Sequence, residues 1–493
     1  MFRTSRVEGR MRQTNPLLIP GRNCWRIERA NRFALIVDAS DYFRFAKAAM
    51  LRAQCRIMLI GWDFDTRISF EPKAQTLEGP NELGKFLSWL PKHRPDLQIY
   101  VLKWDLGMLQ ALGRGMTPLF IIDWITSNRL RFKLDGMHPV GAAHHQKIVV
   151  IDDALAFCGG IDMTVDRWDT PEHLDNEPRR KTPRGQPSGP WHDATTAIDG
   201  PAARALGDLA RQRWQVATGE QLAPCSRSSD PWPSDLRPTL KDVDVAIART
   251  SPEVADRKEV REIEALYLDA IGSAKQTIYV ETQYLASRRI AEALARRLED
   301  KNGPEIVLVL PETADGWLEH KAMDGARFKL LKMLWGADVH RRFGVYYPVT
   351  TAGNPIYVHA KILIADDWLL RVGSSNLNNR SMGFDTECDL VVEADDERLR
   401  DAIVGIRRTL LSEHLNVTPE VVTGVMKDTA GSVLKTVERL RGSGRTLKPF
   451  DHATIREDES VLAESELLDP EKTTESSIDR LSRTLSGWFS TRP

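Results

Sequence analysis

The sequence has few cysteines and no long apolar run. Its five cysteines are scattered over 493 residues without C-x-x-C spacing, and they predict free thiols in a reducing compartment rather than structural zinc. No stretch approaches the roughly 18 uncharged apolar residues that a transmembrane helix needs. The first 30 residues are rich in arginine and lack an apolar core, so no secretory signal peptide is expected.

The chain also lacks a net charge of either sign. Its formal charge is −1, so no overall field favours nucleic acid. Two segments are biased: residues 1–32 hold eight arginines against two glutamates, and residues 457–479 are acidic. Both are expected to be solvated, partly disordered termini. Contact of the basic segment with anionic lipid headgroups is the alternative.

What the chain does have is one pattern that occurs twice. A histidine, a lysine two positions later and an aspartate five positions after the lysine recur at an offset of 214 residues. The copies are His145, Lys147 and Asp152, and His359, Lys361 and Asp366. Downstream, the run from Gly159 to Asp162 falls opposite the run from Gly373 to Asn376 with no change of offset. A duplication in register makes chance a poor explanation.

Each copy is followed by two β-branched or aliphatic runs separated by aspartate, which predicts a β-hairpin. Residues two apart on a strand share a face, so each hairpin presents one imidazole beside one ammonium. Two hairpins related by a pseudo-twofold axis supply what phosphodiester exchange needs. One neutral histidine attacks phosphorus, the other protonates the leaving oxygen, and two lysines balance the phosphate charge without a metal. Asp152 and Asp366 are expected to orient an imidazole or to pin the hairpin.

These residues resemble the signature of the phospholipase D superfamily, the duplicated HKD motif. The second copy, continued by residues 373–381 and 385–387, is especially close, and residues 61–65, 167–170, 191–193 and 278–284 add further similar pieces. The resemblance covers roughly residues 20–415 and is nearest to the eukaryotic-like phospholipases D of bacteria. It implies an enzyme with no cofactor or metal, active in the presence of chelator. Asp162 stands where the second half has Asn376, so phosphate binding is assigned to Asn376 alone.

The duplication extends to the predicted secondary structure. Strands at 56–60 and 97–102 match strands at 277–281 and 305–310, and helical stretches at 41–53 and 258–273 precede them. This alternation predicts an α/β fold of two pseudo-twofold-related α-β-α halves with mixed sheets and one active site at their interface. The predicted divisions are a basic segment (1–32), a first half (33–218), a linker (219–240), a second half (241–415) and a helical or irregular tail (416–493). Within the tail we expect a helix over 421–440, an irregular charged stretch over 442–474 and a helix with one apolar face over 478–489.

Further polar and aromatic residues are candidates for the substrate site. They are Glu281, Gln283, Trp168, Trp191, His192 and Glu387. Glu281 and Gln283 lie at the end of a strand, at the same edge of the sheet where the two histidines are expected. The alternative to a role in substrate binding is a buried polar network that supports the pocket. Glu387 is expected to orient His145 across the interface. Trp168, Trp191 and His192 are expected to line the headgroup pocket, although tryptophan is equally common in cores and loop hinges.

The leading hypothesis is a metal-independent phosphodiesterase that converts phospholipids to phosphatidate and an alcohol at a membrane surface. A phosphatidyltransferase is the runner-up, and a nuclease or a degenerate binding module is less favoured because both motifs are complete and no basic face is evident. Because both motifs lie in one chain, we expect a monomer without a nucleic-acid partner. The expected location is cytoplasmic or peripheral to a membrane, with export without a leader left open.

Overall fold

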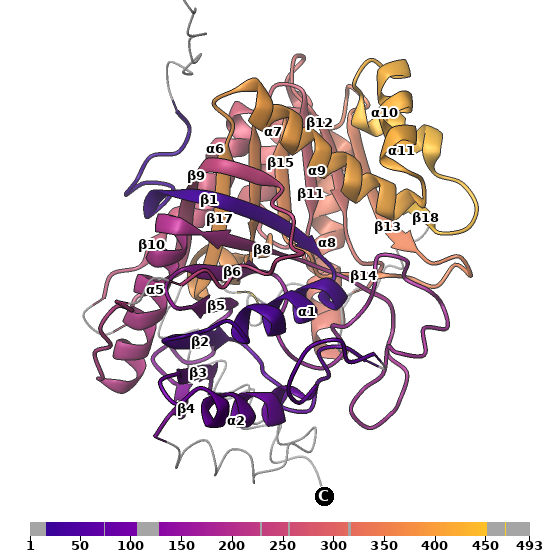
Figure 1. The fold of residues 1–493 in the computed structure, drawn as a ribbon. Coiled ribbons are helices and arrows are strands. Elements are labelled where there is room, and N and C mark those ends of the chain that lie inside the picture. Colours follow the sequence, from indigo (N-terminus) through magenta and orange to yellow (C-terminus); the bar gives the residue numbers. More distant parts are fainter. Residues whose placement is uncertain are drawn as a thin grey trace, which may run out of the picture.

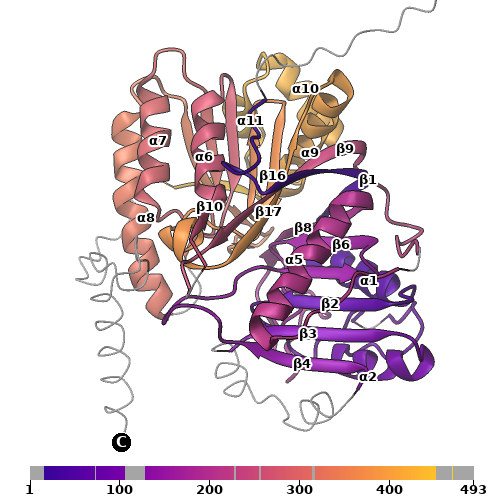
Figure 2. The ribbon, with the colours of Figure 1, turned by 90° about the vertical axis from the view of Figure 1, so that its left-hand side faces the viewer.

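The computed structural model describes residues 16–72, 74–105, 128–226, 229–254, 257–313, 317–450 and 469, with side chains of α8 from residue 324 onward. In this part of the chain a mixed sheet of 16 strands forms the centre, and helices pack on both of its faces (Figure 1). The two halves of the sequence occupy opposite ends of the sheet (Figure 2).

The first half contributes strands in the spatial order β4-β3-β2-β5-β6-β8-β1. Their bounds are β1 Arg26–Val37, β2 Arg56–Gly61, β3 Gln98–Trp104, β4 Leu130–Asp135, β5 Ile148–Ile151, β6 Leu155–Gly159 and β8 Ala194–Asp199. The helices are α1 Ala39–Met50, α2 Leu83–His93 and α5 Gly200–Thr218.

The second half repeats this order as β13-β12-β11-β15-β16-β17-β9. Its strands are β9 Leu240–Ser251, β10 Val260–Arg261, β11 Thr277–Glu281, β12 Glu305–Val309, β13 Phe343–Val349, β15 Ile362–Ala365, β16 Leu369–Gly373 and β17 Glu387–Glu393. Its helices are α6 Glu262–Ser273, α7 Arg288–Glu299, α8 Trp317–Ala337 and α9 Glu397–Leu415, and a π-helical turn, η1, spans Arg380–Phe384.

Pairing within the halves is equivalent. The outer three strands of each half are parallel, and the remaining neighbours are antiparallel. The predicted α/β class with pseudo-twofold halves is confirmed, but the halves share one sheet rather than forming two. Strand β1 is 12 residues long, so it pairs with β8 over one stretch and with β9 across the junction.

Alternation along the strands explains how one sheet carries helices on both faces. Ile57 and Leu59 on β2 pack in the cluster with α1 and α2, whereas Met58 and Ile60 pack in the cluster that contains α5. The corresponding cluster of the second half is built on α6, α7 and α8. Because successive side chains on a strand point to opposite faces, buried strands that are apolar throughout are covered on both sides.

The ends of the predicted segments differ from the structure in two places. The boundary at residue 33 falls inside β1, so part of the basic segment belongs to the sheet. The single helix predicted over 421–440 is two helices, α10 (Pro419–Asp428) and α11 (Val433–Leu440), separated where Ala430 and Gly431 have φ of 54° and 83°. Such values do not continue a right-handed helix.

The stretch 442–474, expected to be irregular, contains a strand. Strand β18 (Thr446–Pro449) pairs with the edge strand β13, so that prediction is wrong for these residues. The apolar helix face predicted over 478–489 lies outside the described residues. Within the described chain, none of the helices is long and apolar enough to span a membrane.

The prediction of five free thiols is wrong for two of them. Cys55 and Cys225, separated by 170 residues, form a disulfide with their Cα atoms 6.3 Å apart. Cys24, Cys158 and Cys388 are free and buried. Sequence spacing carries no sign of the pair because the segment after α5 returns to the start of β2 only in the tertiary structure. A reducing compartment therefore no longer follows from the cysteines.

Candidate active site

Both histidines of the repeated motif are placed by backbone pairing with the opposite half. The His145 N–H donates to the Thr386 carbonyl at 2.9 Å, and His144 forms a parallel bridge with Thr386. The His359 N–H donates to the His192 carbonyl at 2.8 Å, next to the two-stranded pairing of β7 (Trp191–His192) with β14 (Tyr357–Val358). Each histidine thus lies beside a residue of the other half, Thr386 or His192, that directly precedes an acidic residue.

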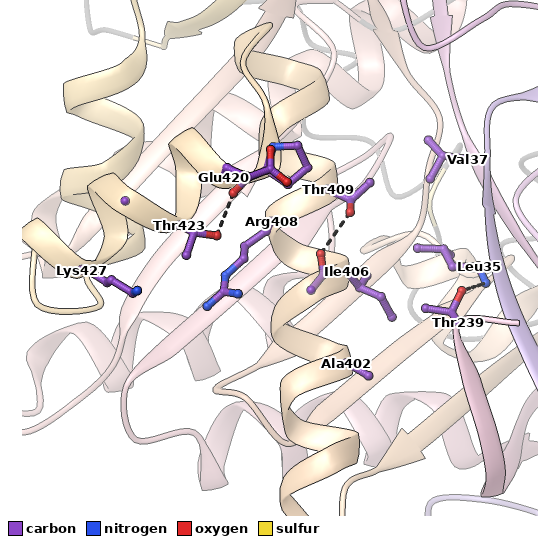
Figure 3. Close-up of a pocket in the computed structure, with 13 residues that line it drawn as sticks. Leu35, Val37, Thr239, Ala402, Ile406, Arg408, Thr409, Glu420, Thr423 and Lys427 are labelled. Atoms are coloured by element: carbon purple, nitrogen blue, oxygen red, sulfur yellow. Dashed lines mark hydrogen bonds between the residues drawn. The ribbon is translucent and has the colours of Figure 1, made fainter. Parts of the chain in front are cut away.

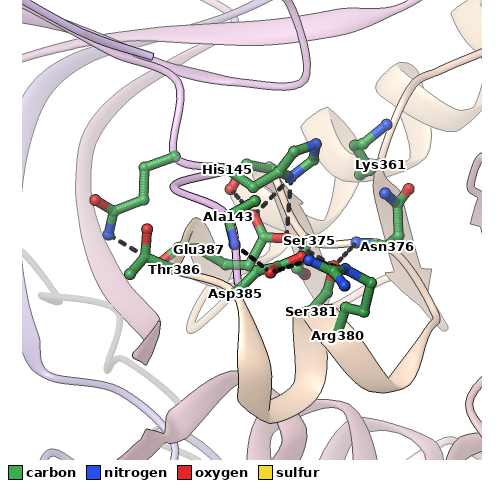
Figure 4. Close-up of polar contacts among 12 residues, drawn as sticks. Ala143, His145, Lys361, Ser375, Asn376, Arg380, Ser381, Asp385, Thr386 and Glu387 are labelled. Carbon is green, nitrogen blue, oxygen red and sulfur yellow. Dashed lines mark hydrogen bonds and ion pairs between the residues drawn. The ribbon is translucent and has the colours of Figure 1, made fainter. Parts of the chain in front are cut away.

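The residues that follow these pairings are carboxylates, and each one holds the histidine of the other half. Glu387 contacts His145 Nδ1 through both oxygens at 3.0 Å (Figure 4). Asp193 contacts His359 Nδ1 through Oδ2 at 2.6 Å. With Nδ1–H donating to a carboxylate, a neutral imidazole has its lone pair on Nε2. Both rings are therefore set to react through Nε2.

The carboxylates are themselves fixed. Glu387 is fully buried and accepts hydrogen bonds from the Ser374 and Ser381 hydroxyls. Asp193, also fully buried, was missed as a site residue in the sequence. Its position directly before β8 corresponds to that of Glu387 at the start of β17, and aligning those two segments is the signal that finds it.

Lysines and an amide complete the polar surface. Lys147 Nζ lies 3.0 Å from Asp162 Oδ2, and Lys361 Nζ lies 3.3 Å from Gln283 Oε1. Asn376 Oδ1 is buried and has no hydrogen-bond partner within the described chain. Figure 4 shows Lys361 and Asn376 beside His145. The two halves therefore differ at this position. In the first half the Asp162 carboxylate faces Lys147, whereas in the second half the Asn376 amide lies beside Lys361.

The two aspartates of the motif pin the hairpins and do not touch an imidazole. Asp152 accepts from the backbone N–H groups of residues 54–56, and Asp366 accepts from those of residues 275–277. Of the two roles predicted for them, the structure supports pinning. Each carboxylate ties the turn of its hairpin to the start of the neighbouring strand, β2 or β11, at the end of β5 or β15 that is opposite the histidine.

Aromatic rings wall the site on both sides. Trp191 stacks on Tyr357 with centroids 4.5 Å apart and lies 5.3 Å from the His359 ring. Trp62 meets the His145 ring edge-on at 6.2 Å. The Gln283 amide donates to the Tyr357 hydroxyl at 2.9 Å. Trp191 and Gln283 are thus brought to the site as predicted from the sequence, whereas Trp62 was noted only as part of a similar segment.

Three predicted residues lie elsewhere. His192 is fully buried between Glu281 and Glu413, each 2.7 Å from one of its ring nitrogens, so it does not line a pocket. Glu281 belongs to the same buried network, which was the alternative to a site role. Trp168 lies under the Arg179 guanidinium at 5.1 Å and lines a separate groove. The alternation of side chains along β7 explains why His192 points away from the site, because its neighbours Trp191 and Asp193 take the positions that face it.

The electrostatic environments of the two histidines differ. Burial opposes ionisation of Glu387, but the charge and hydrogen bond of His145, with Lys147 and Ser374, outweigh it and lower the pKa of Glu387 to about 2. Burial, with the charges of Lys361, Arg167, Lys147 and His145, lowers the pKa of His359 well below its ordinary value. His359 is therefore neutral in the empty site at neutral pH.

The second lysine is also affected. Burial lowers the pKa of Lys361 to about 7, with Lys147 adding to the shift and Asp193 opposing it. An anion bound between the lysines would reverse these effects, because it supplies the negative charge that the cluster lacks. The site is thus built to bind an anion and to gain protons when it does so.

Figure 3 shows a groove on another part of the surface, between α9, α10 and β1. Leu35, Ile406, Arg408 and Thr423 are among its lining residues. None of the side chains that hold His145 or His359 lines this groove, so it is separate from the histidine site.

Comparison with known proteins agrees with this geometry. Residues 135–291 match the domain family described as Phospholipase D, and residues 267–403 match that described as Cardiolipin synthase, PLD-like domain. Phospholipase D A of Dictyostelium discoideum is 22% identical over 464 residues, covering 78% of this chain and 36% of that protein. Phospholipase D alpha 1 of Nicotiana tabacum is 23% identical over 516 residues, covering 76% and 63%. The chain thus spans less than two thirds of the length of these relatives.

A solved structure shares the fold. The phosphatidylserine synthase of Haemophilus influenzae Rd KW20 superposes with a TM-score of 0.56 at 14% identity, covering 84% of this chain and 97% of that one. At this identity the likeness concerns the arrangement of strands and helices alone.

Proposed function

The chain belongs to the phospholipase D superfamily, and we propose that it hydrolyses glycerophospholipids to phosphatidate and a free headgroup alcohol. The observation that carries the proposal is the crossed pairing of His145 with Glu387 and of His359 with Asp193, which points both Nε2 atoms to one lysine-bearing site. The names of the relatives support a phospholipid as the diester.

The reaction proceeds in two steps. His145 Nε2 attacks phosphorus and forms a P–N bond as the P–O bond to the headgroup breaks, and His359 Nε2–H gives its proton to the departing oxygen. Water then loses a proton to His359 and attacks phosphorus, releasing phosphatidate and His145. Lys147, Lys361 and the Asn376 amide hold the phosphate oxygens through both steps.

The assignment of His145 as nucleophile rests on its partner. A phosphorylated imidazole bears positive charge, and Glu387, with a pKa of about 2, is fully ionised beside it. Asp193 has its pKa raised by burial and is the weaker counter-ion. His359, neutral in the empty site, gains its proton when the anionic substrate arrives, which suits an acid that must act only on bound diester.

The pH dependence of kcat/KM tests these protonation states. We expect kcat/KM to fall with rising pH as His359 loses its proton, and to fall more steeply above about pH 7, where the ammonium of Lys361, pKa about 7, is lost as well. The substitution Lys361→Arg should remove the steeper part, because a guanidinium stays protonated. A profile measured from pH 5 to 9 that steepens equally in both proteins would contradict the role of Lys361.

Phosphatidyl transfer to an alcohol follows from the same intermediate, and this makes a phosphatidyltransferase the second candidate. The Trp191, Tyr357 and Gln283 wall beside His359 supports it, because an acceptor must lie within reach of that base. We further propose that a monomer acts at a lipid surface, since both halves of the site come from one chain.

Competition between water and alcohol tests the covalent intermediate. Added ethanol or glycerol is expected to divert product from phosphatidate to the phosphatidyl-alcohol in proportion to its concentration, without changing the rate of headgroup release. Product mass spectrometry on phosphatidylcholine, phosphatidylethanolamine and phosphatidylglycerol vesicles measures the partition. Phosphatidate as the only product at high alcohol would exclude the shared intermediate, and cleavage of single-stranded DNA but not of lipid would exclude the substrate class.

A further inference from the structure

A second cluster of ligand-type side chains lies beneath the histidine site. It consists of Asp38 after β1, His173 in the loop before β7, His192 on β7, and Glu413 on α9. All four are buried, with exposures of 0, 1, 0 and 8%. The first three belong to the first half of the chain and Glu413 to the second, so the cluster spans the interface between the halves.

The four side chains converge on one point. His173 Nε2 lies 3.2 Å from Glu413 Oε1 and 3.7 Å from Asp38 Oδ2. His192 Nδ1 lies 2.7 Å from Glu413 Oε1 and 3.7 Å from Asp38 Oδ1. All of the ligand atoms fall within 4.8 Å of one another. Ligands around tetrahedral zinc, with bonds of about 2.0–2.1 Å, stand about 3.3 Å apart, so an ion fits after shifts of about half an ångström.

The outer nitrogen of each histidine is bound by a carboxylate. His173 Nδ1 lies 2.9 Å from Asp169 Oδ2, and His192 Nε2 lies 2.7 Å from Glu281 Oε2. This arrangement fixes each ring with its remaining nitrogen facing the centre of the cluster. Metal-binding histidines are held in the same way, by a carboxylate on the nitrogen that does not bind the ion.

One oxygen of the cluster has no hydrogen-bond partner among the described residues. Asp38 is fully buried, yet its Oδ2 receives no hydrogen bond. An unpartnered carboxylate oxygen in a protein interior is costly, because it has lost water and gained nothing. Its nearest counterpart is the inward nitrogen of His173, 3.7 Å away, so the oxygen points into the space that the four ligands enclose.

The charges of the surroundings are compatible with a divalent cation. Four carboxylates belong to the cluster and its outer shell: Asp38, Asp169, Glu281 and Glu413. Two guanidinium groups offset them, since Arg180 lies 2.9 Å from Asp169 and Arg445 acts on three of the four. If both histidines bind an ion as neutral ligands, four negative and two positive charges leave −2, which one divalent cation balances. Without an ion, burial opposes protonation of both rings, but the surrounding carboxylates outweigh it and raise the pKa of His173 to about 9 and that of His192 well above its ordinary value, so that two imidazolium charges balance the cluster instead.

We propose that Asp38, His173, His192 and Glu413 bind one zinc ion, which fastens the two halves together below the active site. Two imidazole nitrogens and two carboxylate oxygens form a ligand set that suits zinc. Four protein ligands close the coordination shell, so the ion is structural and takes no part in phosphoryl transfer. The proposal replaces the expectation of a metal-free chain, and it stands independently of the phospholipase activity.

The ion would also support the catalytic acid. The Asp38 N–H donates to the Asp193 carbonyl at 2.8 Å, and the Asp193 N–H donates to Asp38 Oδ1 at 3.2 Å. Asp193 in turn holds His359. A metal bound to Asp38 therefore fixes the backbone that carries the carboxylate of the acid–base pair.

Metal analysis of the full chain tests the proposal. The protein is made in zinc-supplemented medium and dialysed against a chelating resin. Elemental mass spectrometry is then expected to find one zinc per chain. Protein made with cobalt instead should show the visible absorption of tetrahedral Co²⁺. Zinc restored to protein stripped by prolonged chelation should raise its melting temperature, since an ion that binds the folded state alone stabilises it.

Matched variants locate the site. Glu413→Gln and Asp38→Asn keep side-chain shape and remove a charge, and each should weaken zinc binding by at least about 100-fold in competition with a chromophoric chelator. His144→Gln, a buried ion-paired histidine outside the cluster, should keep one zinc per chain. Wild-type protein that holds no stoichiometric zinc and gains no thermal stability from it would overturn the proposal, as would full zinc retention in both ligand variants. These readouts do not depend on lipid turnover.

Discussion

Replacing His145 or His359 with alanine is expected to reduce turnover by at least about 10⁴-fold while the protein stays folded. In the proposed mechanism His145 carries the phosphorus and His359 carries the proton, and neither neighbouring lysine can perform those tasks. Headgroup release from phospholipid vesicles measures the loss, and circular dichroism checks the fold. His340→Ala, at an exposed histidine, is the control and should turn over normally.

An activated substrate separates the two histidines. With a nitrophenyl phosphodiester the leaving group needs no acid, so His359→Ala should still be phosphorylated on His145. The adduct should accumulate because the base for the second step is missing, and peptide mass spectrometry would locate it. A phosphorylated peptide that contains residue 359, found instead in His145→Ala, would reverse the assignment. Normal turnover by either variant would exclude the site altogether.

The second large effect is expected when the crossed carboxylates become amides. Glu387→Gln and Asp193→Asn should each lower kcat by about 10³–10⁴-fold with little change in KM. In Glu387→Gln, an amide nitrogen that donates to Nδ1 places the imidazole proton of His145 on Nε2, where the nucleophile needs a lone pair. In Asp193→Asn, the loss of the carboxylate removes the charge that stabilises the imidazolium of His359, and a proton fixed on Nε2 blocks this ring as the base of the second step. Glu387→Asp, which keeps the charge but shortens the side chain, should recover part of the rate.

A buried carboxylate away from the histidines supplies the control for these amides. Glu262 is 7% exposed and pairs with Arg249 at 2.7 Å, so Glu262→Gln tests the loss of a buried charge without touching an imidazole. Its kcat should stay within about threefold of wild type, whatever its stability. If Glu387→Gln and Asp193→Asn behaved like Glu262→Gln, the crossed carboxylates would be structural supports rather than positioning residues for the histidines.

The repeated motif by itself determines which reactive side chains the protein carries for the proposed chemistry. Two histidines and two lysines at matched offsets specify paired acid–base groups and anion binding, because these tasks depend on residue type and on the side-chain period of a strand. Strand and helix alternation likewise predicts the α/β halves. Such features are local: each depends on residues that stand within a few positions of one another.

The tertiary structure decided everything that depends on residues far apart in the chain. Asp193 becomes the partner of His359 only because β7 pairs with β14, across 166 residues. The Cys55–Cys225 disulfide, whose cysteines have a sequence separation of 170, is of the same kind. From the sequence, His192 was expected in the pocket, but in the structure it points inward to Glu281. The sequence left two roles open for Asp152, and in the structure its carboxylate accepts hydrogen bonds from backbone amides.

The same distinction explains the buried cluster of Asp38, His173, His192 and Glu413. Its members are spread over 375 residues of sequence without ligand-type spacing, so no motif announces them. They meet because α9 of the second half packs on the interface with the first. Local sequence therefore determined which chemical groups the protein has for the proposed phosphodiester cleavage. Long-range packing, driven by burial of the shared sheet, decided which carboxylate faces which imidazole.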